Sequence, residues 1–330
     1  MKIAIVTEAI ADYVSGGLQH TIYVLNELKK LGHDVCCFVK HPPYQSLWLH
    51  ADFPIYPIGS NIWEEYDGIL VCIFSPVAEL VATHKNSQDR FFLVHANEGL
   101  FTYNGQEWTK RAIDSYKLPL KLMCVSSYLQ ILMEQVYNRN VIGLTVPPGV
   151  DDNIFNDIGR TEYDGGILNI AIFNRGGWIR GVDTALQAVN GLDPKKFKIN
   201  VIPDGVRDRK LVANIFKQSH VYIDASRLAG SPTIPKEAMI CGCIPICTYY
   251  GAVDYILSGY NGFIIPPDNM FAITNTVKFL SEDPELVRQI SQNAIEYCER
   301  FTWDKIAQRM VFAINEGLLR MDLLETKVWR

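Results

Sequence analysis

The stretch SRLAGSPTIPKEAMICGCIPICTYYGAVDYILSGYNG, residues 226–262, decides the fold that we expect for this chain. A loop broken by glycine and proline (Ala229–Pro235) runs into a short helix that is predicted to open at Lys236 and Glu237. An apolar strand (Ile244–Cys247) and a second short helix after a turn at Gly251 are predicted to follow. A loop that enters a helix leaves free backbone N–H groups and a positive dipole end, so this junction suits a phosphate.

Glu237 lies in the first turn of the first predicted helix. A carboxylate is an unusual neighbour for a phosphate, but it can accept hydrogen bonds from two sugar hydroxyls at once. Glu237 is therefore a candidate sugar-binding residue. The alternative is a glutamate that caps a helix in an ordinary α/β unit.

Length and composition describe a globular protein with two domains. The chain has 330 residues, of which 48% are apolar and 20% charged, and this length exceeds a comfortable single core. The net charge of −5 argues against a general nucleic-acid binder. No apolar run approaches the roughly 18 residues that span a bilayer, and the first residues do not resemble a signal peptide. We expect a cytoplasmic protein, with peripheral contact to a membrane as an option.

The eight cysteines fall mostly within apolar strands, which suits a reducing compartment. Cys241, Cys243 and Cys247 have a spacing that matches no common zinc pattern, and no histidine lies near them in the sequence. We therefore expect core thiols rather than a metal site, and no cofactor.

Strands and helices alternate along the first half of the chain, which is typical of a parallel sheet. Strands are predicted over 2–7, 33–39, 68–74, 91–95, 120–125 and 141–145, and helices after Gly17, over 76–83 and from about 127 to 137. Gly16 and Gly17 separate the first strand from the first helix and let a ligand approach the backbone closely. The G-x-G-x-x-G pattern of dinucleotide sites is absent.

His95 ends a predicted strand, at the edge where open α/β sheets gather their ligand groups. It is a candidate contact for a sugar or a phosphate. The alternative is a histidine that bonds a neighbouring loop carbonyl. Downstream, basic residues stand among aromatic ones at Lys110, Arg111, Lys117 and Lys121. A solvated helix face explains them best, and contact with an anionic membrane or acceptor is the alternative.

The second half repeats the alternation after a stiff Pro-Pro-Gly segment at Pro147–Gly149, which we take as the domain boundary. A strand over 168–173 and a helix over 182–189 flank a loop that carries Arg175 and Arg180. Two guanidinium forks on one loop could clamp a diphosphate, although two exposed arginines on a surface loop would look the same. Strands near 199–202, 221–223 and after Cys243 complete a second Rossmann-like sheet, which predicts a ligand between the domains.

In order and spacing, these motifs resemble the retaining GT-B glycosyltransferases of family four over nearly the whole chain. In the N-terminal half the resemblance rests on Gly16-Gly17, on the strand-end His95 and on Pro148–Asp151, which is similar to an N-G-V-D hinge. In the C-terminal half it rests on Asn174–Gly181 (similar to G-R-L-x-x-x-K-G), Glu237–Gly242 (E-A-M-x-C-G), Gly259–Pro267 (G-x-x-G-x-x-x-P) and Phe301–Trp303.

The resemblance implies transfer of a sugar from a nucleotide diphosphate sugar (UDP-, GDP- or ADP-linked) to a hydroxyl acceptor, with retention of configuration and without a metal. The acceptor would be a glycan, a lipid-linked sugar or another hydroxyl compound. It also implies three regions, namely an acceptor-side domain (1–150), a nucleotide-sugar domain (151–310) and a C-terminal helix (311–330) that packs back towards the first.

The resemblance also implies roles for individual residues. Arg175 and Arg180 would neutralise the leaving diphosphate, Glu237 would bind the ribose hydroxyls, and His95 a hydroxyl of the donor sugar. The donor phosphates and sugar would contact Gly16, Gly17, Gly230, Ser231, Thr233 and Ile234.

Three departures from the family pattern affect this interpretation. Ala229 stands where the family has the first glutamate of its signature, and Pro232 where it usually has glycine. The region over 206–221 is short, so the strand that frames the nucleotide base is hard to find. Two alternatives stay open for these reasons: a non-catalytic relative that binds a glycan or nucleotide as a partner subunit, and a sugar-nucleotide epimerase of GT-B fold.

Overall fold

The computed structural model describes residues 1–10, 16–45, 49–100 and 105–325, with side chains up to Leu319, and divides the chain into two compact units. Unit 1 contains Met1–Pro148 and the chain from Trp303 onward, and unit 2 contains Gly149–Thr302. The chain thus re-enters unit 1 at Trp303, earlier than the predicted 311. The last residues of the predicted C-terminal region, 326–330, lie outside the described part. The expected location of a ligand between the domains stays a prediction.

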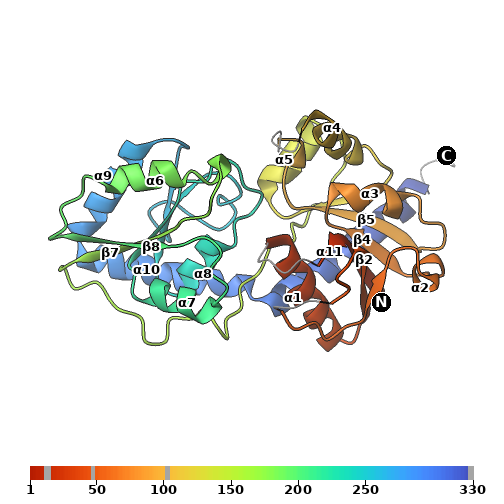
Figure 1. The fold of residues 1–330 in the computed structure, drawn as a ribbon, viewed down its shortest axis with the longest axis horizontal. Coiled ribbons are helices and arrows are strands. Elements are labelled where there is room, and N and C mark those ends of the chain that lie inside the picture. Colours follow the sequence, from red (N-terminus) through yellow and green to blue (C-terminus); the bar gives the residue numbers. More distant parts are fainter. Residues whose placement is uncertain (11–15, 46–48, 101–104, 326–330) are drawn as a thin grey trace. The chain divides into compact units, whose positions relative to one another are not determined.

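Unit 1 contains a six-stranded, all-parallel sheet with the order β3-β2-β1-β4-β5-β6. Its strands are β1 (Lys2–Ala9), β2 (Asp34–His41), β3 (Ile55–Pro57), β4 (Ile69–Cys72), β5 (Asp89–Val94) and β6 (Lys121–Cys124). Its helices are α1 (Gly16–Lys30), α2 (Asn61–Glu64), α3 (Ser75–Ala82), η1 (Glu98–Leu100), α4 (Gln106–Ser115), α5 (Ser127–Gln135) and α11 (Trp303–Glu325). Helix α1 packs beside α11, and α3 packs beside α4 on the other side of the sheet (Figure 1).

Unit 2 contains a five-stranded parallel sheet with the order β11-β10-β9-β7-β8. Its strands are β7 (Leu168–Phe173), β8 (Phe197–Ile202), β9 (Val221–Asp224), β10 (Ile244–Thr248) and β11 (Phe263–Ile265). Its helices are η3 (Trp178–Arg180), α6 (Val182–Val189), α7 (Arg209–Lys217), α8 (Ile234–Ile240), α9 (Met270–Ser281), α10 (Pro284–Cys298) and η4 (Glu299–Phe301). Helices α6 and α9 cover one face of this sheet, and α7 and α8 cover the other (Figure 1). The predicted α/β fold with two parallel sheets is thereby confirmed.

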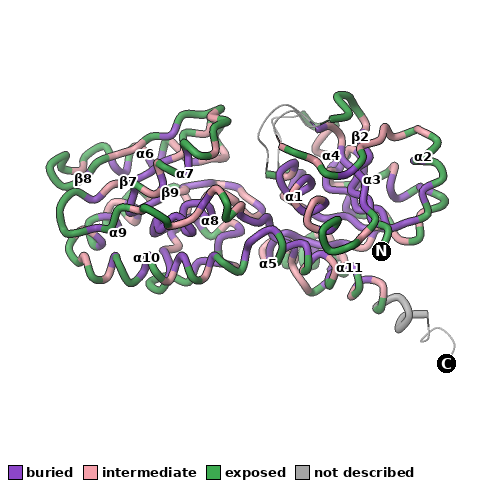
Figure 2. The backbone as a smooth tube through the Cα atoms, turned by 90° about the horizontal axis from the view of Figure 1, so that it is seen from below, coloured by how far each residue is buried: buried purple, intermediate pink, exposed green. Residues whose placement is uncertain are grey.

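Burial explains why these segments are strands. The central strands are runs of isoleucine, valine, leucine, phenylalanine and cysteine, and both faces of a parallel sheet must be covered by helices. Figure 2 shows the central strands of both units as buried, whereas the outer faces of the helices are exposed. In unit 2 one core cluster is formed by the β7, β9 and β10 side chains against the apolar faces of α6, α9 and α10.

The strand order reverses once in each sheet, and this reversal locates the sites. In unit 1 it reverses between β1 and β4, and in unit 2 between β7 and β9. Chains that leave such neighbouring strands go to opposite faces and open a crevice at the carboxyl ends. In unit 2 that edge carries Phe173, at the end of β7, and Asp224, at the end of β9.

The predicted strand over 141–145 was wrong. Only an isolated bridge forms there, at Val141, because side chains occupy the backbone groups that a strand ladder would use. The Gln130 amide donates to the carbonyls of Ile142 (2.8 Å) and Gly143 (2.9 Å). The Glu316 carboxylate accepts the N–H of Gly143 at 3.0 Å.

The predicted helix after Gly251 was also wrong, because turns replace it there. Gly251 has a φ of +65°, outside the helical region, and the Asn261 carboxamide accepts the backbone N–H of Leu257 at 2.7 Å. Helix α8 opens at Ile234, before the predicted start at Lys236 and Glu237, because Pro235 is well tolerated in a first turn. The short strands β3 and β11 and helix α9 were missed.

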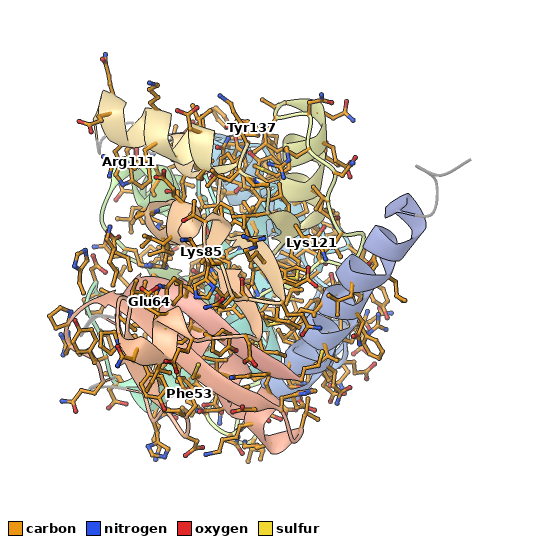
Figure 3. The ribbon with its side chains drawn as sticks, turned by 90° about the vertical axis from the view of Figure 1, so that its right-hand side faces the viewer. Phe53, Glu64, Lys85, Arg111, Lys121 and Tyr137 are labelled. Carbon is orange, nitrogen blue, oxygen red and sulfur yellow. The ribbon has the colours of Figure 1, made fainter. Side chains whose placement is uncertain are left out.

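Three of the four basic residues in and near α4 form ion pairs on the surface of unit 1. Arg111 pairs with Glu107 at 3.0 Å and Lys117 with Asp114 at 2.9 Å, both among exposed side chains. Lys121 pairs with Asp89 at the edge of the sheet. Figure 3 labels Arg111 beside the helix at the top of the view and Lys121 below it. Acidic partners on the same surface favour a solvated helix face over a membrane-binding one.

Candidate functional site

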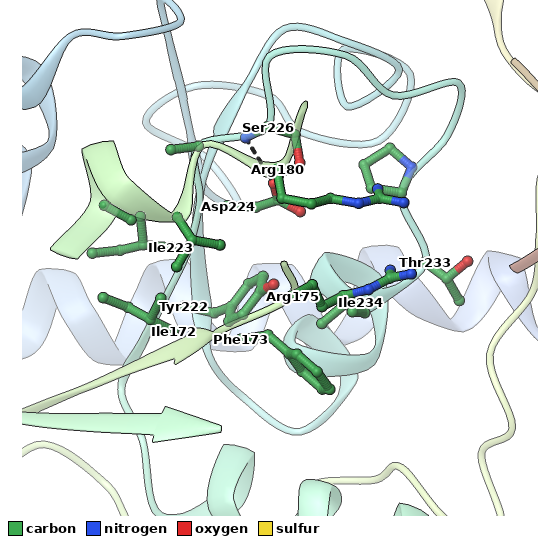
Figure 4. Close-up of a pocket in the computed structure, with 14 residues that line it drawn as sticks. Ile172, Phe173, Arg175, Arg180, Tyr222, Ile223, Asp224, Ser226, Thr233 and Ile234 are labelled. Carbon is green, nitrogen blue, oxygen red and sulfur yellow. Dashed lines mark hydrogen bonds between the residues drawn. The ribbon is translucent and has the colours of Figure 1, made fainter. Parts of the chain in front are cut away.

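A pocket opens in unit 2 at the carboxyl ends of β7 and β9, where the strand order reverses (Figure 4). Its walls come from these strand ends, the start of α6 and the loop before α8. Four predicted site residues line it, namely Arg175, Arg180, Thr233 and Ile234. Segments that are distant in the sequence therefore meet where a doubly wound sheet places a ligand.

Arg175 and Arg180 are half-buried and come from the two ends of the loop that links β7 to α6. Figure 4 shows both side chains extending in the same direction, towards Thr233. Within the described ranges, no hydrogen bond or ion pair joins the Arg175 guanidinium to another residue. Two cationic forks that converge on one pocket make an anion site, and parallel forks match phosphate oxygens.

Arg227 holds the β7–α6 loop in place. Its backbone N–H donates to Ile179 O (2.8 Å), and its side chain donates to Trp178 O (2.7 Å). The guanidinium also pairs with Asp183 at 2.8 Å and Asp268 at 2.6 Å. The hydrogen bond from Arg227 lowers the pKa of Asp183 below its usual value. Arg227 therefore ties the β7–α6 loop to the start of α6 and to the turn before α9.

The loop before α8, which carries Gly230 and Ser231, is fixed by two buried side chains. Lys236 donates to the Ser231 hydroxyl at 3.3 Å, and Tyr255 donates to Pro232 O at 3.2 Å. Lys236 is fully buried, with its ammonium 5.0 Å from the centre of the Tyr255 ring. Pro232 therefore lies in a loop that hydrogen bonds from two buried side chains hold in place.

Glu237 lies beside the pocket and does not line it. Only 1% of the residue is exposed, and its Oε1 accepts a hydrogen bond from Arg209 at 2.6 Å. Its charge acts on Tyr222, whose ring does line the pocket and whose pKa is raised by burial. The predicted role in binding ribose stays a prediction.

Two residues of this site were missed in the sequence. Asp224 ends β9 and lines the pocket, and its Oδ1 accepts the Ser226 N–H (3.0 Å) and hydroxyl (2.5 Å). The strand-end argument that selected His95 could have selected Asp224, which follows the predicted strand over 221–223. Arg209 had no local signal, because it opens a helix of ordinary amphipathic character.

In unit 1, Gly17 and His95 lie together at the carboxyl edge of the sheet. A Cβ atom on Gly17 would come within 3.1 Å of the His95 Nδ1 and 3.0 Å of the Phe74 ring. His20, from α1, stacks on His95 with 5.0 Å between ring centres and 7° between planes. Gly16 begins the same helix. The structure thus brings the predicted glycine pair and the predicted histidine to one place.

Burial lowers the pKa of His95 to about 4, so its ring is neutral at physiological pH. Its Nε2 is shielded from solvent and has no hydrogen-bond partner among the described residues. A neutral imidazole with a free nitrogen can donate to or accept from a ligand hydroxyl. Among the described residues no loop carbonyl bonds Nε2, so the alternative of a histidine that bonds a loop carbonyl does not hold for this nitrogen.

Glu98, three residues after His95, is a buried carboxyl that sequence reasoning did not select. It accepts the Ser75 N–H (3.3 Å) and hydroxyl (2.6 Å) at the start of α3. Burial raises the pKa of Glu98 to about 7, and the nearby Glu8 adds to the rise. Glu98 therefore ties the loop after β5 to α3 and titrates near neutrality.

We expect Glu98→Gln to remove a pH-dependent loss of stability. The native pKa of Glu98 is about 7 and the ordinary value is 4.5, so the native state holds this proton longer than the unfolded chain. Stability is therefore lost as the pH rises through this window, by on the order of 3 kcal/mol. In urea unfolding, the free energy of unfolding of the variant relative to the wild type should be higher at pH 8 than at pH 5. Glu107→Gln, at an exposed glutamate of α4, is the control; a pH-independent difference for Glu98→Gln would contradict the prediction.

Three further observations concern the cysteines, possible metal ligands and the helices. All eight cysteines are buried free thiols, and Cys243 donates to the carbonyl of Phe216 at 3.1 Å. Among the described residues, no group of three or more His, Cys, Asp or Glu side chains could hold a metal ion. Over the same ranges, no helix has both the length and the hydropathy needed to cross a membrane.

Comparison with known sequences links this chain to one family. The family model described as "Glycosyl transferases group 1" matches residues 181–297, which run from the start of α6 nearly to the end of α10. An uncharacterized glycosyltransferase of Methanocaldococcus jannaschii is 25% identical over 281 residues, or 76% of each chain.

Solved structures with the same architecture have low sequence identity. Sucrose-phosphate synthase from Thermosynechococcus elongatus superposes with a TM-score of 0.75 at 14% identity, covering 98% of this chain and 99% of that one. HepE of Anabaena, solved with UDP and glucose, has a TM-score of 0.69 at 16% identity, covering 96% of this chain and 99% of that one. These likenesses show that the fold is GT-B.

Proposed function

We propose which groups carry the reaction of this chain, which belongs to the group 1 glycosyltransferases and transfers sugar from a nucleotide sugar. The pocket of unit 2 binds the donor's diphosphate, and the reaction retains the anomeric configuration without a metal. The observation that carries this proposal is the convergence of Arg175 and Arg180 on one pocket at the reversal of strand order.

The two arginines account for the main electrostatic demand of the reaction. As the bond between the anomeric carbon and the phosphate oxygen breaks, negative charge grows on the leaving diphosphate. Arg175 and Arg180 line the pocket from one loop and stabilise that charge without rearrangement. Two fixed cations supply the neutralisation that a metal ion provides in other sites.

The remaining steps follow from the balance of bonds and protons. The acceptor oxygen forms the new bond to the anomeric carbon on the face that the diphosphate leaves, which preserves the configuration. The acceptor hydroxyl's proton passes to the departing phosphate oxygen, so no side-chain base is required. Asp224 lines the pocket with one oxygen bound to Ser226, and we propose that it contacts the donor sugar near the position left empty at Ala229.

On unit 1 we propose that His95 binds a hydroxyl of the donor sugar and that Gly16 and Gly17 admit the donor phosphates to the backbone. The neutral, unpartnered Nε2 of His95 supports the first role, and the tight contact of Gly17 with that ring supports the second. A side chain at position 17 would fill the space above the imidazole. Gly230, Ser231, Thr233 and Ile234 are proposed to contact the donor in unit 2.

For the acceptor we propose a hydroxyl compound such as a glycan or a lipid-linked sugar. The cytoplasm stays our proposal for its location, because the eight cysteines are all free thiols.

We expect one of UDP, GDP and ADP to bind with micromolar to millimolar affinity, as is usual for substrates. Calorimetric titration of the three nucleotides selects the base, and UDP is tested first because HepE was solved with it. The matching nucleotide sugars are then assayed for slow hydrolysis without acceptor. If none of the three nucleotides binds, the proposed donor site is wrong.

A further inference from the structure

We propose that His20 orients the imidazole of His95 by ring stacking and is thus a positioning residue of the donor site. His20 lies on α1 and His95 directly follows β5, so both belong to unit 1. This role rests on the function proposed above, in which His95 binds a hydroxyl of the donor sugar. Sequence reasoning did not select His20, which acts on the sugar only through His95.

The imidazole of His95 is held by other rings rather than by hydrogen bonds. Across the described ranges, neither of its two nitrogens forms a hydrogen bond with the protein. Histidines that bind a ligand through one nitrogen are usually oriented by a hydrogen bond at the other. Here the contacts are the stacked ring of His20, with 5.0 Å between ring centres and 7° between planes, and a T-shaped contact with Phe74 at 6.3 Å. The orientation of His95 therefore depends on ring packing.

His20 can fix a neighbouring ring because it is itself enclosed. It is buried, and the ring of Trp303 packs against it with 5.7 Å between ring centres. Tyr23, on the same helix, stacks on Trp303 at 4.9 Å and 6°. Trp303 opens α11, at the point where the chain re-enters unit 1. The packing of α11 on α1 thus holds His20, and His20 in turn holds His95.

Loss of the His20 ring would free the imidazole of His95 to turn. Stacked and T-shaped rings attract each other in preferred geometries, so the stack limits rotation of the side chain. The ring also lies against Gly17, where a Cβ atom would come within 3.1 Å of Nδ1. A misplacement of about 1 Å can cost on the order of a hundredfold in rate. A turned His95 should therefore lower sugar transfer and leave the binding of the free nucleotide unchanged, because it is the sugar that His95 contacts.

Two substitutions separate the ring of His20 from its nitrogens. His20→Asn keeps a polar side chain but removes the ring, and it should lower kcat/KM for the nucleotide sugar by about tenfold or more. The affinity for the free nucleotide, measured by calorimetry, should stay within about twofold. His20→Phe keeps a flat ring without nitrogens and should stay within about threefold of the wild-type kcat/KM. A loss in His20→Phe as large as in His20→Asn, or full activity of His20→Asn, would overturn the inference.

A double-mutant cycle distinguishes positioning from general packing. In the background of His95→Ala, His20→Asn should cause no further loss of kcat/KM, because its effect passes through His95. Additive losses would contradict this role. His84→Phe is the control, since His84 is another buried histidine of unit 1, packed on Trp63 at 4.6 Å, and it should keep the wild-type kcat/KM. Urea unfolding reports the stability of each variant. If His20→Asn does not fold, His20→Phe decides: activity near the wild type supports the role, and a loss of about tenfold or more rejects it.

The outcomes separate the role of His20 from the proposed function. If nucleotide binding depends on Arg175 and His95→Ala lowers transfer, but His20→Asn does not, the proposed function stands and the role of His20 is wrong. If His95→Ala leaves transfer unchanged, the proposed contact of His95 with the sugar is wrong, and the role of His20 with it. If no nucleotide binds to the wild type, the donor site itself is wrong.

Discussion

Arg175→Ala is expected to lower kcat/KM for the nucleotide sugar by about a hundredfold or more, and Arg180→Ala by a similar factor. Each change removes a preorganised donor from the place where leaving-group charge develops. Neither side chain is part of a core cluster, and both line the pocket, so the fold should persist. Steady-state donor hydrolysis or transfer measures the effect.

A graded series makes this prediction specific. Arg175→Lys keeps the charge but loses the planar fork, so it should recover only part of the activity. Arg300→Ala removes a guanidinium from an exposed position beside the Tyr297 ring and serves as the matched control. If Arg175→Ala and Arg180→Ala both bind and turn over the donor like the wild type, the diphosphate clamp is wrong.

Much of the fold could be predicted because its signals are local. The run Leu168–Phe173 is apolar throughout, and Gly181 marks the start of α6, so both elements were predicted with their observed bounds. The predicted strand over 141–145 failed for a tertiary reason. Its carbonyls and amides are taken by Gln130 and by Glu316, and the latter is 173 residues from Gly143. No local pattern contains that information.

In the candidate site, too, local features could be predicted and tertiary contacts could not. Arg175 and Arg180 share one short loop with glycines, so the sequence predicted that they lie near each other, whereas only the structure shows that both line one pocket. Arg209 stands 28 residues before Glu237, in a helix that looks ordinary, and only the packing of α7 against α8 brings the pair together. Sequence reasoning predicted that Glu237 would bind hydroxyl groups, but it could not show that one of its two oxygens is already occupied.

Gly181→Ala is expected to destabilise unit 2 by about 3 kcal/mol or more, and it is a test of the loop geometry itself. Gly181 has a φ of +59°, which costs other residues about 1–2 kcal/mol. A Cβ atom there would also come within 1.8 Å of the Ala225 carbonyl oxygen, so the β7–α6 loop and the end of β9 would have to move apart. Because both segments line the pocket, nucleotide affinity should fall together with stability.

Gly177→Ala, four residues earlier in the same loop, separates the two causes. Gly177 also has a positive φ, +95°, but a Cβ atom there would have no neighbour within 4 Å. This variant should therefore show only a backbone cost, about 1–3 kcal/mol, because its φ of +95° and ψ of +144° lie in a region that glycine almost alone adopts. Urea unfolding of both variants gives the comparison. Equal losses of unfolding free energy in the two variants would mean that the close approach of Gly181 to Ala225 does not shape the pocket. A clearly larger loss for Gly181→Ala would show that this approach fixes the position of Arg180 relative to the end of β9.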